Sequence, residues 1–260
     1  MKNFRLRSFS LIFAAGLLIS TVLPGCSFQG DPHKPPMTLF IGLDTSGSFV
    51  NSPFYADSIK FLAIYIYGHL HEMGGLAKPR EIFVTSIGGK GMDDPKTFHQ
   101  IHDFEGRSVP EIEEDLKRWF PQGDPITDFN AFFEKAARLT KERNLVLTPI
   151  SLVVVSDGIP DIPGVSPKAA AKTLYGKINL ESLDYLARNI TVRLIYASPK
   201  VGDNWRKFVP RERVRLMTVD ADIMVGWKRQ YQQDLDPAKQ AKLWKWVEDT
   251  VDMRVRTAKI

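Results

Sequence analysis

The sequence predicts an α/β protein built on a doubly wound, mainly parallel β-sheet with helices on both faces. Short apolar runs rich in branched and aromatic residues recur along the chain, and amphipathic stretches lie between them. Three of the runs are almost continuously apolar, which is typical of strands covered on both faces. The alternation of strand and helix favours parallel strands joined by right-handed crossovers.

Five apolar runs are predicted as strands. They are residues 37–44, 81–88, 150–157, 190–198 and 214–220. The runs that start at Met37, Ile150 and Ile190 are the near-continuous ones. The segment "KTFHQIHDF", residues 96–104, is predicted to add a short antiparallel strand at one edge.

Apolar residues at helical spacing predict helices between the strands. The clearest stretches are residues 55–73, 128–144 and 180–189. A last helix is expected over residues 236–251, with Asp236 as its N-cap and Pro237 in its first turn.

Polar residues gather where predicted strands end. Asp44 follows "LFIGL" and Asp157 follows "LVVVS", and a third loop, "PQGDPITDFN", reaches Thr127 just before a helix. In open parallel sheets, ligands bind at the carboxyl ends of the strands, near the point where the strand order reverses. Carboxylates and hydroxyls that meet there suit a hard cation such as Mg²⁺, which takes oxygen ligands.

The segment "DTSGS" resembles the D-x-S-x-S motif of the von Willebrand factor type A (vWA) domain. The resemblance extends over roughly residues 37–230, through "VVVSDGIPD" and the loop at "ITDFN". It implies a doubly wound α/β fold with a metal-ion-dependent adhesion site. In such a site, a carboxylate from the bound partner completes the shell of a divalent cation, here Mg²⁺ or Mn²⁺.

The resemblance also assigns roles to individual residues. Ser46 and Ser48 match the direct hydroxyl ligands, and Asp44 matches a carboxylate that acts mostly through water. Thr127 matches the threonine of the second loop, and Asp157 matches the aspartate that closes the site.

The loop at Thr127 departs from the family pattern. The family often has a glycine close before the threonine, whereas here Gly123 lies four positions earlier with Pro125 between them. Asp128 and Asp124 therefore stay open as alternative contributors. Asp161 is expected to bond the backbone of its own loop.

The amino-terminal segment has the pattern of a signal peptide. Three basic residues precede 13 residues without a charge, and the segment ends in "LPGC". This ending resembles the lipobox of bacterial lipoproteins, which implies cleavage before Cys26 and lipid attachment to that cysteine. Ser27 follows the cysteine, and in lipoproteins of double-membrane bacteria a residue other than Asp there permits export to the outer membrane.

These patterns divide the chain into three parts. They are a signal peptide at 1–25, the lipidated Cys26 with a proline-rich tether at 26–36, and a vWA-like domain with a C-terminal helix at 37–260. Removing the leader lowers the formal net charge from +5 to +2. A near-neutral chain does not favour nucleic-acid binding. Four of the five histidines, at positions 69, 71, 99 and 102, are predicted to be exposed surface residues without a zinc site.

The leading prediction is a binding module rather than an enzyme. It is anchored in the cell envelope by lipid, at the outer membrane facing the periplasm or at the cell surface, and binds an acidic group of a partner protein through its cation. A metal-free structural lipoprotein is one alternative, in which Asp44 and Ser46 only form a helix-capping turn. The other is a Mg²⁺-dependent phosphatase, but that class needs a second carboxylate at the position of Ser46.

Overall fold

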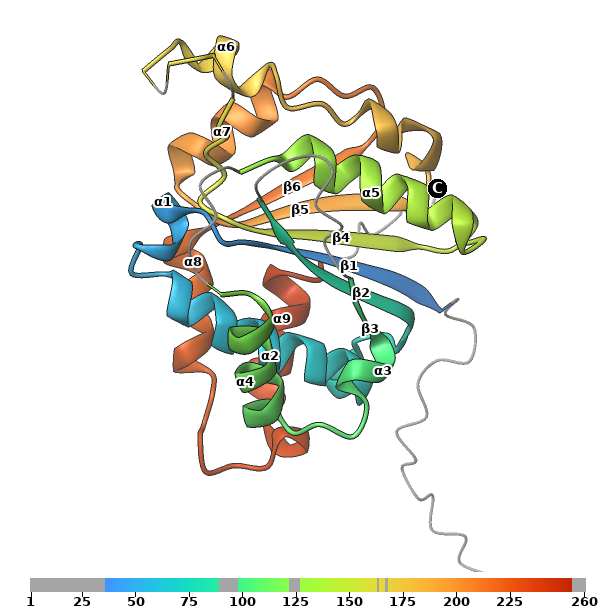
Figure 1. Ribbon diagram of the computed structural model, residues 1–260. Coiled ribbons are helices and arrows are strands. Elements are labelled where there is room, and N and C mark those ends of the chain that lie inside the picture. Colours follow the sequence, from blue (N-terminus) through green and yellow to red (C-terminus); the bar gives the residue numbers. More distant parts are fainter. Residues whose placement is uncertain (1–35, 89–97, 122–126, 163, 167, 254–260) are drawn as a thin grey trace, which may run out of the picture.

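A six-stranded sheet forms the centre of the molecule, with strand order β3-β2-β1-β4-β5-β6 (Figure 1). The computed structural model describes residues 36–88, 98–121, 127–162, 164–166 and 168–253. The strands are β1 (Met37–Asp44), β2 (Pro79–Ile87), β3 (His99–Gln100), β4 (Ile150–Val155), β5 (Ile190–Ala197) and β6 (Arg215–Asp220). All neighbours pair in parallel except β2 and β3, which are antiparallel. The predicted doubly wound, mainly parallel sheet is confirmed.

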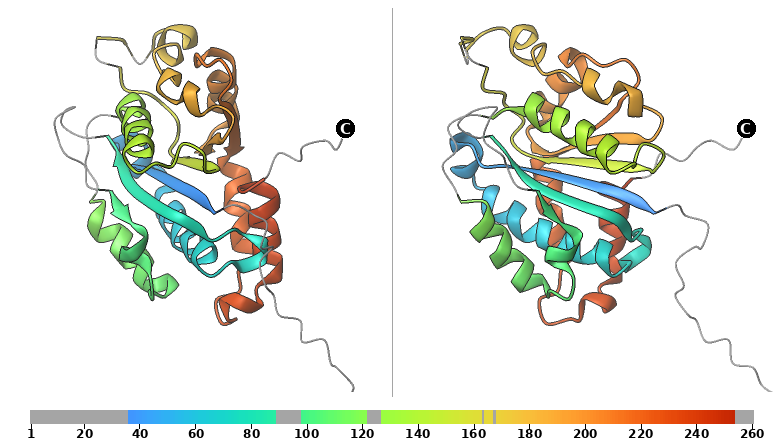
Figure 2. Two further views of the ribbon diagram at one scale, coloured as in Figure 1. Left: turned by 90° about the vertical axis from the view of Figure 1, so that its right-hand side faces the viewer. Right: turned by 45° about the vertical axis from the view of Figure 1, so that its right-hand side comes forward.

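Helices cover both faces of the sheet (Figures 1 and 2). The α-helices are α1 (Gly47–Val50), α2 (Tyr55–Leu70), α3 (Ile101–Phe104), α4 (Val109–Trp119), α5 (Phe129–Glu142), α6 (Ala171–Tyr175), α7 (Pro199–Phe208), α8 (Ala221–Met224) and α9 (Ala241–Thr250). The 3₁₀ helices are η1 (Met73–Gly75), η2 (Glu181–Leu186), η3 (Val225–Arg229) and η4 (Pro237–Lys239). One core packs α2, α4 and α9 against the sheet, and the other packs α5, η2 and α7 on the opposite face.

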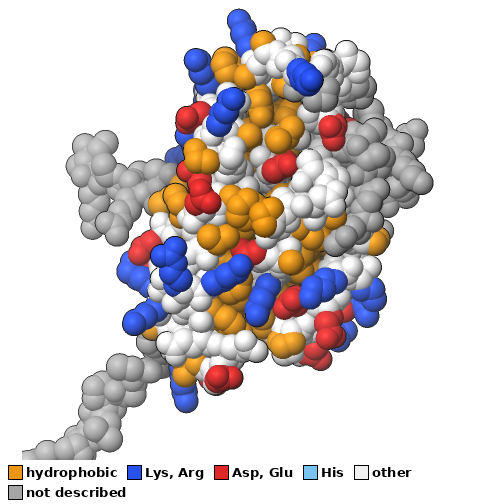
Figure 3. Space-filling view, turned by 90° about the vertical axis from the view of Figure 1, so that its left-hand side faces the viewer, with side chains coloured by type: hydrophobic (Ala, Val, Ile, Leu, Met, Phe, Trp, Pro, Cys, Tyr) orange, Lys and Arg blue, Asp and Glu red, His pale blue; other side chains and the backbone are white. Residues whose placement is uncertain are grey.

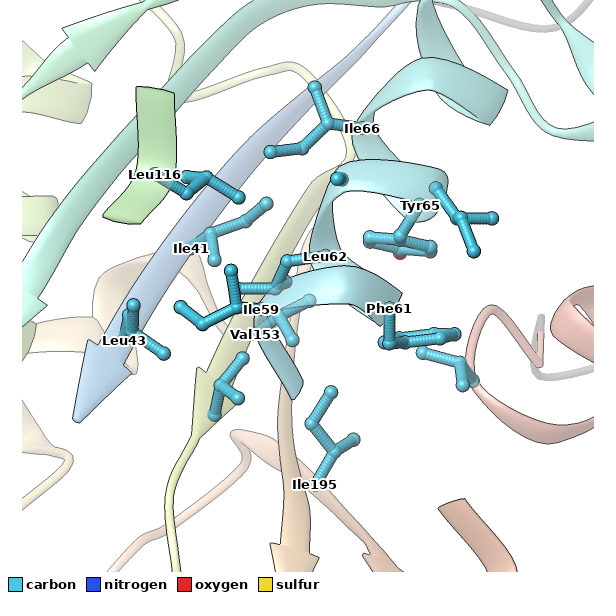
Figure 4. Packing of buried hydrophobic residues seen from close by; sticks show 14 of the residues in the cluster. Ile41, Leu43, Ile59, Phe61, Leu62, Tyr65, Ile66, Leu116, Val153 and Ile195 are labelled. Carbon is cyan, nitrogen blue, oxygen red and sulfur yellow. The ribbon is translucent and has the colours of Figure 1, made fainter. Parts of the chain in front are cut away.

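Alternate side chains of each strand supply the two cores, as the two-residue period of a strand requires. On β1, Ile41 and Leu43 face α2, where they pack with Ile59 and Leu62 (Figure 4). Phe40 points to the opposite face and stacks on Phe83, at 4.9 Å between ring centroids. Burial on both sides explains why this strand is apolar almost throughout.

The strand predictions agree with the structure to within one or two residues at each end, and β3 is the predicted antiparallel edge strand. Two helices that the hydrophobic pattern did not single out, α4 and α7, carry clear start signals. Ser108 and Glu111 form a capping box at α4, and Ser198 caps α7 directly before Pro199.

The last predicted helix is divided in two. Asp236 caps η4, where its carboxylate accepts a hydrogen bond from the backbone of Ala238 at 2.8 Å. The chain then breaks at Gln240, and α9 begins only at Ala241. The Gln240 side chain accepts from the backbone N–H of Gln232 and donates to the carbonyl of Leu235, so this residue holds the preceding loop. The stretch 180–189 also differs, because it forms the 3₁₀ helix η2.

The prediction that His69 is exposed is wrong. Its side chain is fully buried, its Nδ1 lies 2.9 Å from the carbonyl oxygen of Ala77, and its ring meets Tyr65 edge-on. The reason is that α2 is covered by the sheet, by α4 and by η1, so little of its surface reaches solvent. His71 and His102 are exposed, and His99 is half-buried against Trp119.

The predicted signal peptide and all of the tether except its last residue lie outside the described residues, as does Cys26. Among the helices that the structure does describe, none has the length and apolar composition that a membrane span requires.

Candidate metal centre at the carboxyl ends of the strands

The candidate site lies where β1 and β4 end side by side. The two strands are adjacent in the sheet although a long stretch of sequence separates them, so the strand order reverses between them. Leu43 pairs with Val155, which brings the next residues of the two strands, Asp44 and Ser156, together. This is the switch point at which doubly wound sheets bind ligands.

Asp44 lies behind the site and joins the two loops. Its carboxylate is fully buried and accepts the Ser156 hydroxyl at 2.5 Å and the backbone N–H of Ser46 at 2.8 Å. Burial is the main cause that raises the pKa of Asp44 from 3.8 to about 6, although these hydrogen bonds lower it. Among the described residues, no positive charge contributes to the pKa of this carboxylate.

Ser46, Ser48 and Asp157 form the outer part of the group. The Oγ atoms of Ser46 and Ser48 lie 3.2 Å apart, and the Ser48 hydroxyl bonds the Asp157 carboxylate. Asp157 also accepts the backbone N–H of Ile159 at 3.0 Å, and burial raises its pKa above the ordinary value. Ser46 stands at the N-cap of α1, but its side chain makes no capping bond there. A helix-capping turn alone therefore does not explain its hydroxyl.

Thr127 approaches from the loop before α5. Its side chain is 1% exposed, and its backbone N–H donates to the Asp161 carboxylate at 3.3 Å. Its hydroxyl oxygen, however, has no hydrogen-bond partner in the part of the chain that the structure describes. A buried hydroxyl without a partner is costly, and a bound cation would remove this cost.

The alternatives to Thr127 differ in what they offer. Asp128 caps α5, because its carboxylate accepts the backbone N–H of Ala131 at 2.9 Å. Asp124 lies outside the described residues. The structure thus connects Asp44, Ser46, Ser48 and Asp157 directly. Thr127 reaches them through Asp161, which lies in the loop of Asp157.

Three positioning residues did not emerge from the sequence. The position of Ser156 could have indicated its role, because it directly precedes Asp157 at the end of a strand that lies beside β1. Asp161 was expected to bond its own loop, and the structure shows that its carboxylate accepts the backbone N–H of Thr127. Trp205, on α7, donates its indole N–H to the Gly158 carbonyl at 2.7 Å, a contact across 47 residues that no local pattern reveals.

Gly158 sits between Asp157 and this anchor. Its φ is +74°, and a Cβ there would lie 2.9 Å from Val201 and 3.0 Å from Leu194. We expect Gly158→Ala to lower the free energy of unfolding by about 2–3 kcal/mol, through backbone strain together with this clash. Urea denaturation measures the change.

Gly164 is a matched control for that prediction, since its φ is +76° and a Cβ there meets nothing within 4 Å. Gly164→Ala carries only the backbone strain, about 1 kcal/mol. Equal losses in the two variants would show that close packing around Gly158 is not important.

The face that contains the site combines apolar and acidic groups. Figure 3 shows hydrophobic side chains across the middle of this face, with Asp and Glu among them and Lys and Arg both above and below. Ile159 and Ile223 are its large exposed apolar residues, at 42% and 51%. Such a surface around a polar centre is typical of protein-binding sites.

The donor set consists of oxygen atoms only. No group of three or more His, Cys, Asp or Glu residues that could hold a metal occurs within the described ranges. Hydroxyls of Ser46, Ser48 and Thr127 therefore have to supply ligands beside the two carboxylates. This set fits a hard cation such as Mg²⁺ or Mn²⁺ and offers no soft ligand for zinc.

Comparison with known proteins adds a likeness in fold. No family model matches the sequence, and no curated protein matches it. The pilus adhesin SpaC from Lactobacillus rhamnosus GG matches 85% of this chain at 11% identity and a TM-score of 0.49. Proximal thread matrix protein 1 from the mussel byssus, with a zinc-occupied MIDAS motif, matches 74% at 14% identity and a TM-score of 0.43. The SpRpn10 VWA domain matches 84% at 12% identity and a TM-score of 0.39.

All three TM-scores are below 0.5, so the fold class rests on the sheet of this chain itself, with its strand order β3-β2-β1-β4-β5-β6. The chain covers 31% of SpaC and 44% of the byssus protein, but 96% of the SpRpn10 vWA domain. At these identities the likeness concerns the fold alone, so the function has to be argued from the site.

Proposed function

We propose that the chain is a lipid-anchored binding module of the cell envelope. It holds Mg²⁺ or Mn²⁺ at the carboxyl ends of β1 and β4 and binds an acidic group of a partner protein there. The observation that carries the proposal is the buried Thr127 hydroxyl, which has no partner among the described residues and belongs to loops already rich in oxygen donors.

The residues divide into direct and supporting donors. The hydroxyls of Ser46, Ser48 and Thr127 would hold the ion directly, with Asp157 beside them, and Asp44 would compensate its charge from behind. Because most direct donors are neutral, a bound ion keeps much of its positive charge. It would therefore attract a carboxylate of the partner.

The anchor is proposed from the sequence. Cys26 ends a segment that resembles a lipoprotein leader, and lipidation there would attach the domain to the membrane, with the outer membrane as the expected location. A phosphatase is not supported, because Ser46 occupies the position of the second carboxylate and its hydroxyl faces Ser48.

The cation site is tested by thermal unfolding in EDTA and then in rising Mg²⁺ or Mn²⁺. Binding to the folded state stabilises it by about 2.7 kcal/mol at 100 times the dissociation constant, a shift on the order of 5–10 °C for a chain of this size. We expect a saturable rise for the native chain and none for Thr127→Val, which keeps the shape but removes the hydroxyl.

Thr85 offers the matched control. It is 2% exposed, and its hydroxyl also lacks a partner among the described residues, but it lies within β2 and outside the three loops. Thr85→Val should keep the full response to the cation. Flat titrations of the native chain up to tens of millimolar Mn²⁺ would favour the metal-free structural lipoprotein instead.

A further inference from the structure

The residues directly beside the strand starts and those directly beside the strand ends differ in charge. Strand register aligns the first residues of the five parallel strands in one row, since Met37 pairs with Pro79, and Ile150 pairs with Ile190. Within two residues of these five strand starts lie five basic side chains and one acidic one, Glu81. The basic residues are Lys78, Arg80, Arg188, Arg213 and Arg215. Within two residues of the five strand ends lie four aspartates and no basic side chain.

These five basic residues, which we call the basic edge, are open to solvent. All are exposed, and none forms an ion pair or a side-chain hydrogen bond within the described ranges. Folding therefore leaves their charges available to an external anion. A row of unpaired cations of one sign attracts extended anionic surfaces.

An exposed apolar side chain stands on the same edge. Leu147 is 90% exposed, and it is the most exposed of the large hydrophobic residues in the described part of the chain. Its loop lies beside the start of β1, because the hydroxyls of Thr148 and Thr38 are 3.1 Å apart and the Thr38 N–H donates to the Pro149 carbonyl at 2.8 Å. Cations around a projecting leucine suit the interface of an anionic bilayer.

The path of the chain points the same way. Ten residues separate Cys26 from Met37, a length of at most about 35 Å when fully extended. Met37 opens β1 at this edge, on the right-hand side of Figure 1 and facing the viewer in the left view of Figure 2. A lipid on Cys26 would therefore hold the start of β1, and the basic edge beside it, within about 35 Å of the membrane.

We infer that the basic edge and Leu147 dock on the anionic phospholipid surface of the membrane that carries the anchor. This inference rests on the lipid anchor of the proposed function and adds the orientation of the domain. Asp44 is the eighth residue of β1, so it lies about 23 Å from the start of that strand. The candidate metal centre then faces away from the bilayer and is open to a partner.

The test places an environment-sensitive fluorophore on Leu147→Cys of the full chain, reconstituted into vesicles of phosphatidylcholine with or without 30% phosphatidylglycerol. We expect a blue shift and quenching by bilayer-bound quenchers on the anionic vesicles only, both reversed by 0.5 M NaCl. The same label on Ile223→Cys, at the opposite edge, should stay in water on both. A label at position 147 that stays in water on anionic vesicles would overturn the inference.

Charge reversal provides the second test. The triple variant Arg188→Glu, Arg213→Glu and Arg215→Glu should lose the blue shift and lower vesicle partition by at least about 100-fold, at about fivefold for each of the three basic side chains lost. A variant with Lys168→Glu, Lys172→Glu and Lys200→Glu changes the net charge equally but alters exposed lysines near the strand ends. If both variants lose the blue shift equally, the net charge of the domain, and not the basic edge, determines its binding to anionic vesicles, and the inference fails.

Failure of the anchor is seen separately. Cys26 is the one cysteine of the native chain. If a thiol reagent labels the native chain, and the protein does not pellet with the vesicles, Cys26 carries no lipid. Docking is then measured on the unanchored chain, by its pelleting with anionic vesicles at low salt. If the unanchored chain does not pellet with the vesicles but binds a short DNA duplex in a salt-sensitive way, the basic edge binds another polyanion. That result would overturn the inference.

Discussion

Asp44→Asn should stabilise the cation-free protein at neutral pH while abolishing its response to Mg²⁺ and Mn²⁺. Burial raises the pKa of Asp44 from 3.8 to about 6, so the folded protein binds this proton more tightly than the unfolded chain. The resulting stability is fully present below pH 3.8 and is lost as the pH rises through about 6. Above that, the ionised carboxylate costs up to about 3 kcal/mol, and a neutral amide avoids this cost.

Urea denaturation in EDTA between pH 4 and pH 7.5 measures the effect. The native chain should lose stability across this range relative to Asp44→Asn, and the stabilisation by Mn²⁺ should grow as the carboxylate ionises. Asp249→Asn, at an exposed carboxylate that pairs with Lys245 on α9, should keep the pH profile of the native chain. An Asp44→Asn variant that is less stable than the native chain at pH 7.5 in EDTA would contradict the prediction.

Asp57→Ala should produce the largest loss of stability. The Asp57 carboxylate, on α2, accepts the Tyr196 hydroxyl at 2.7 Å and the Trp227 indole N–H at 3.0 Å, and it pairs with Lys228 at 2.5 Å. It thereby joins α2 to the end of β5 and to η3. Its removal leaves two buried donors without an acceptor, which should cost about 3–5 kcal/mol.

Lys228→Met separates the contribution of the charge pair to stability from that of the buried hydrogen bonds. The lysine side chain is 57% exposed but Asp57 is 2% exposed, so Lys228→Met leaves a buried carboxylate that still accepts two hydrogen bonds and should cost about 1–2 kcal/mol, less than Asp57→Ala. Tyr196 depends on this anchor, because its φ of +73° is unfavourable for an aromatic residue. Chemical denaturation of Asp57→Ala and Lys228→Met measures the two losses in the free energy of unfolding. Similar losses would refute a dominant role for the buried hydrogen bonds.

Hydrophobic period and length were sufficient to locate the strands, since a strand buried on both faces has to be apolar almost throughout. They also placed Asp44 and Asp157 at strand ends, where the apolar pattern stops. Hydrophobic pattern was less informative for helices. It did not separate α9 from η4, because the side-chain bonds of Gln240 to the preceding loop decide where that helix begins.

Partners far apart in sequence could not be predicted in the same way. The bond from Ser156 to Asp44 spans 112 residues, and the bond from Trp205 to Gly158 spans 47. The burial of His69 likewise depends on elements that pack around α2 from other parts of the chain. The local hydrophobic pattern does not predict such contacts, because each of them depends on which strands become neighbours in the sheet.

The sequence by itself determined the fold class and the residue types at the carboxyl ends of the strands, because buried strands and their ends are visible in the local hydrophobic pattern. Only the tertiary structure decided that Asp44 is buried behind the site, and that the Thr127 hydroxyl has no partner among the described residues. It also decided that five distant basic residues share one edge. The physical reason is that strand order and register set these relations, and both follow from packing across the whole sheet.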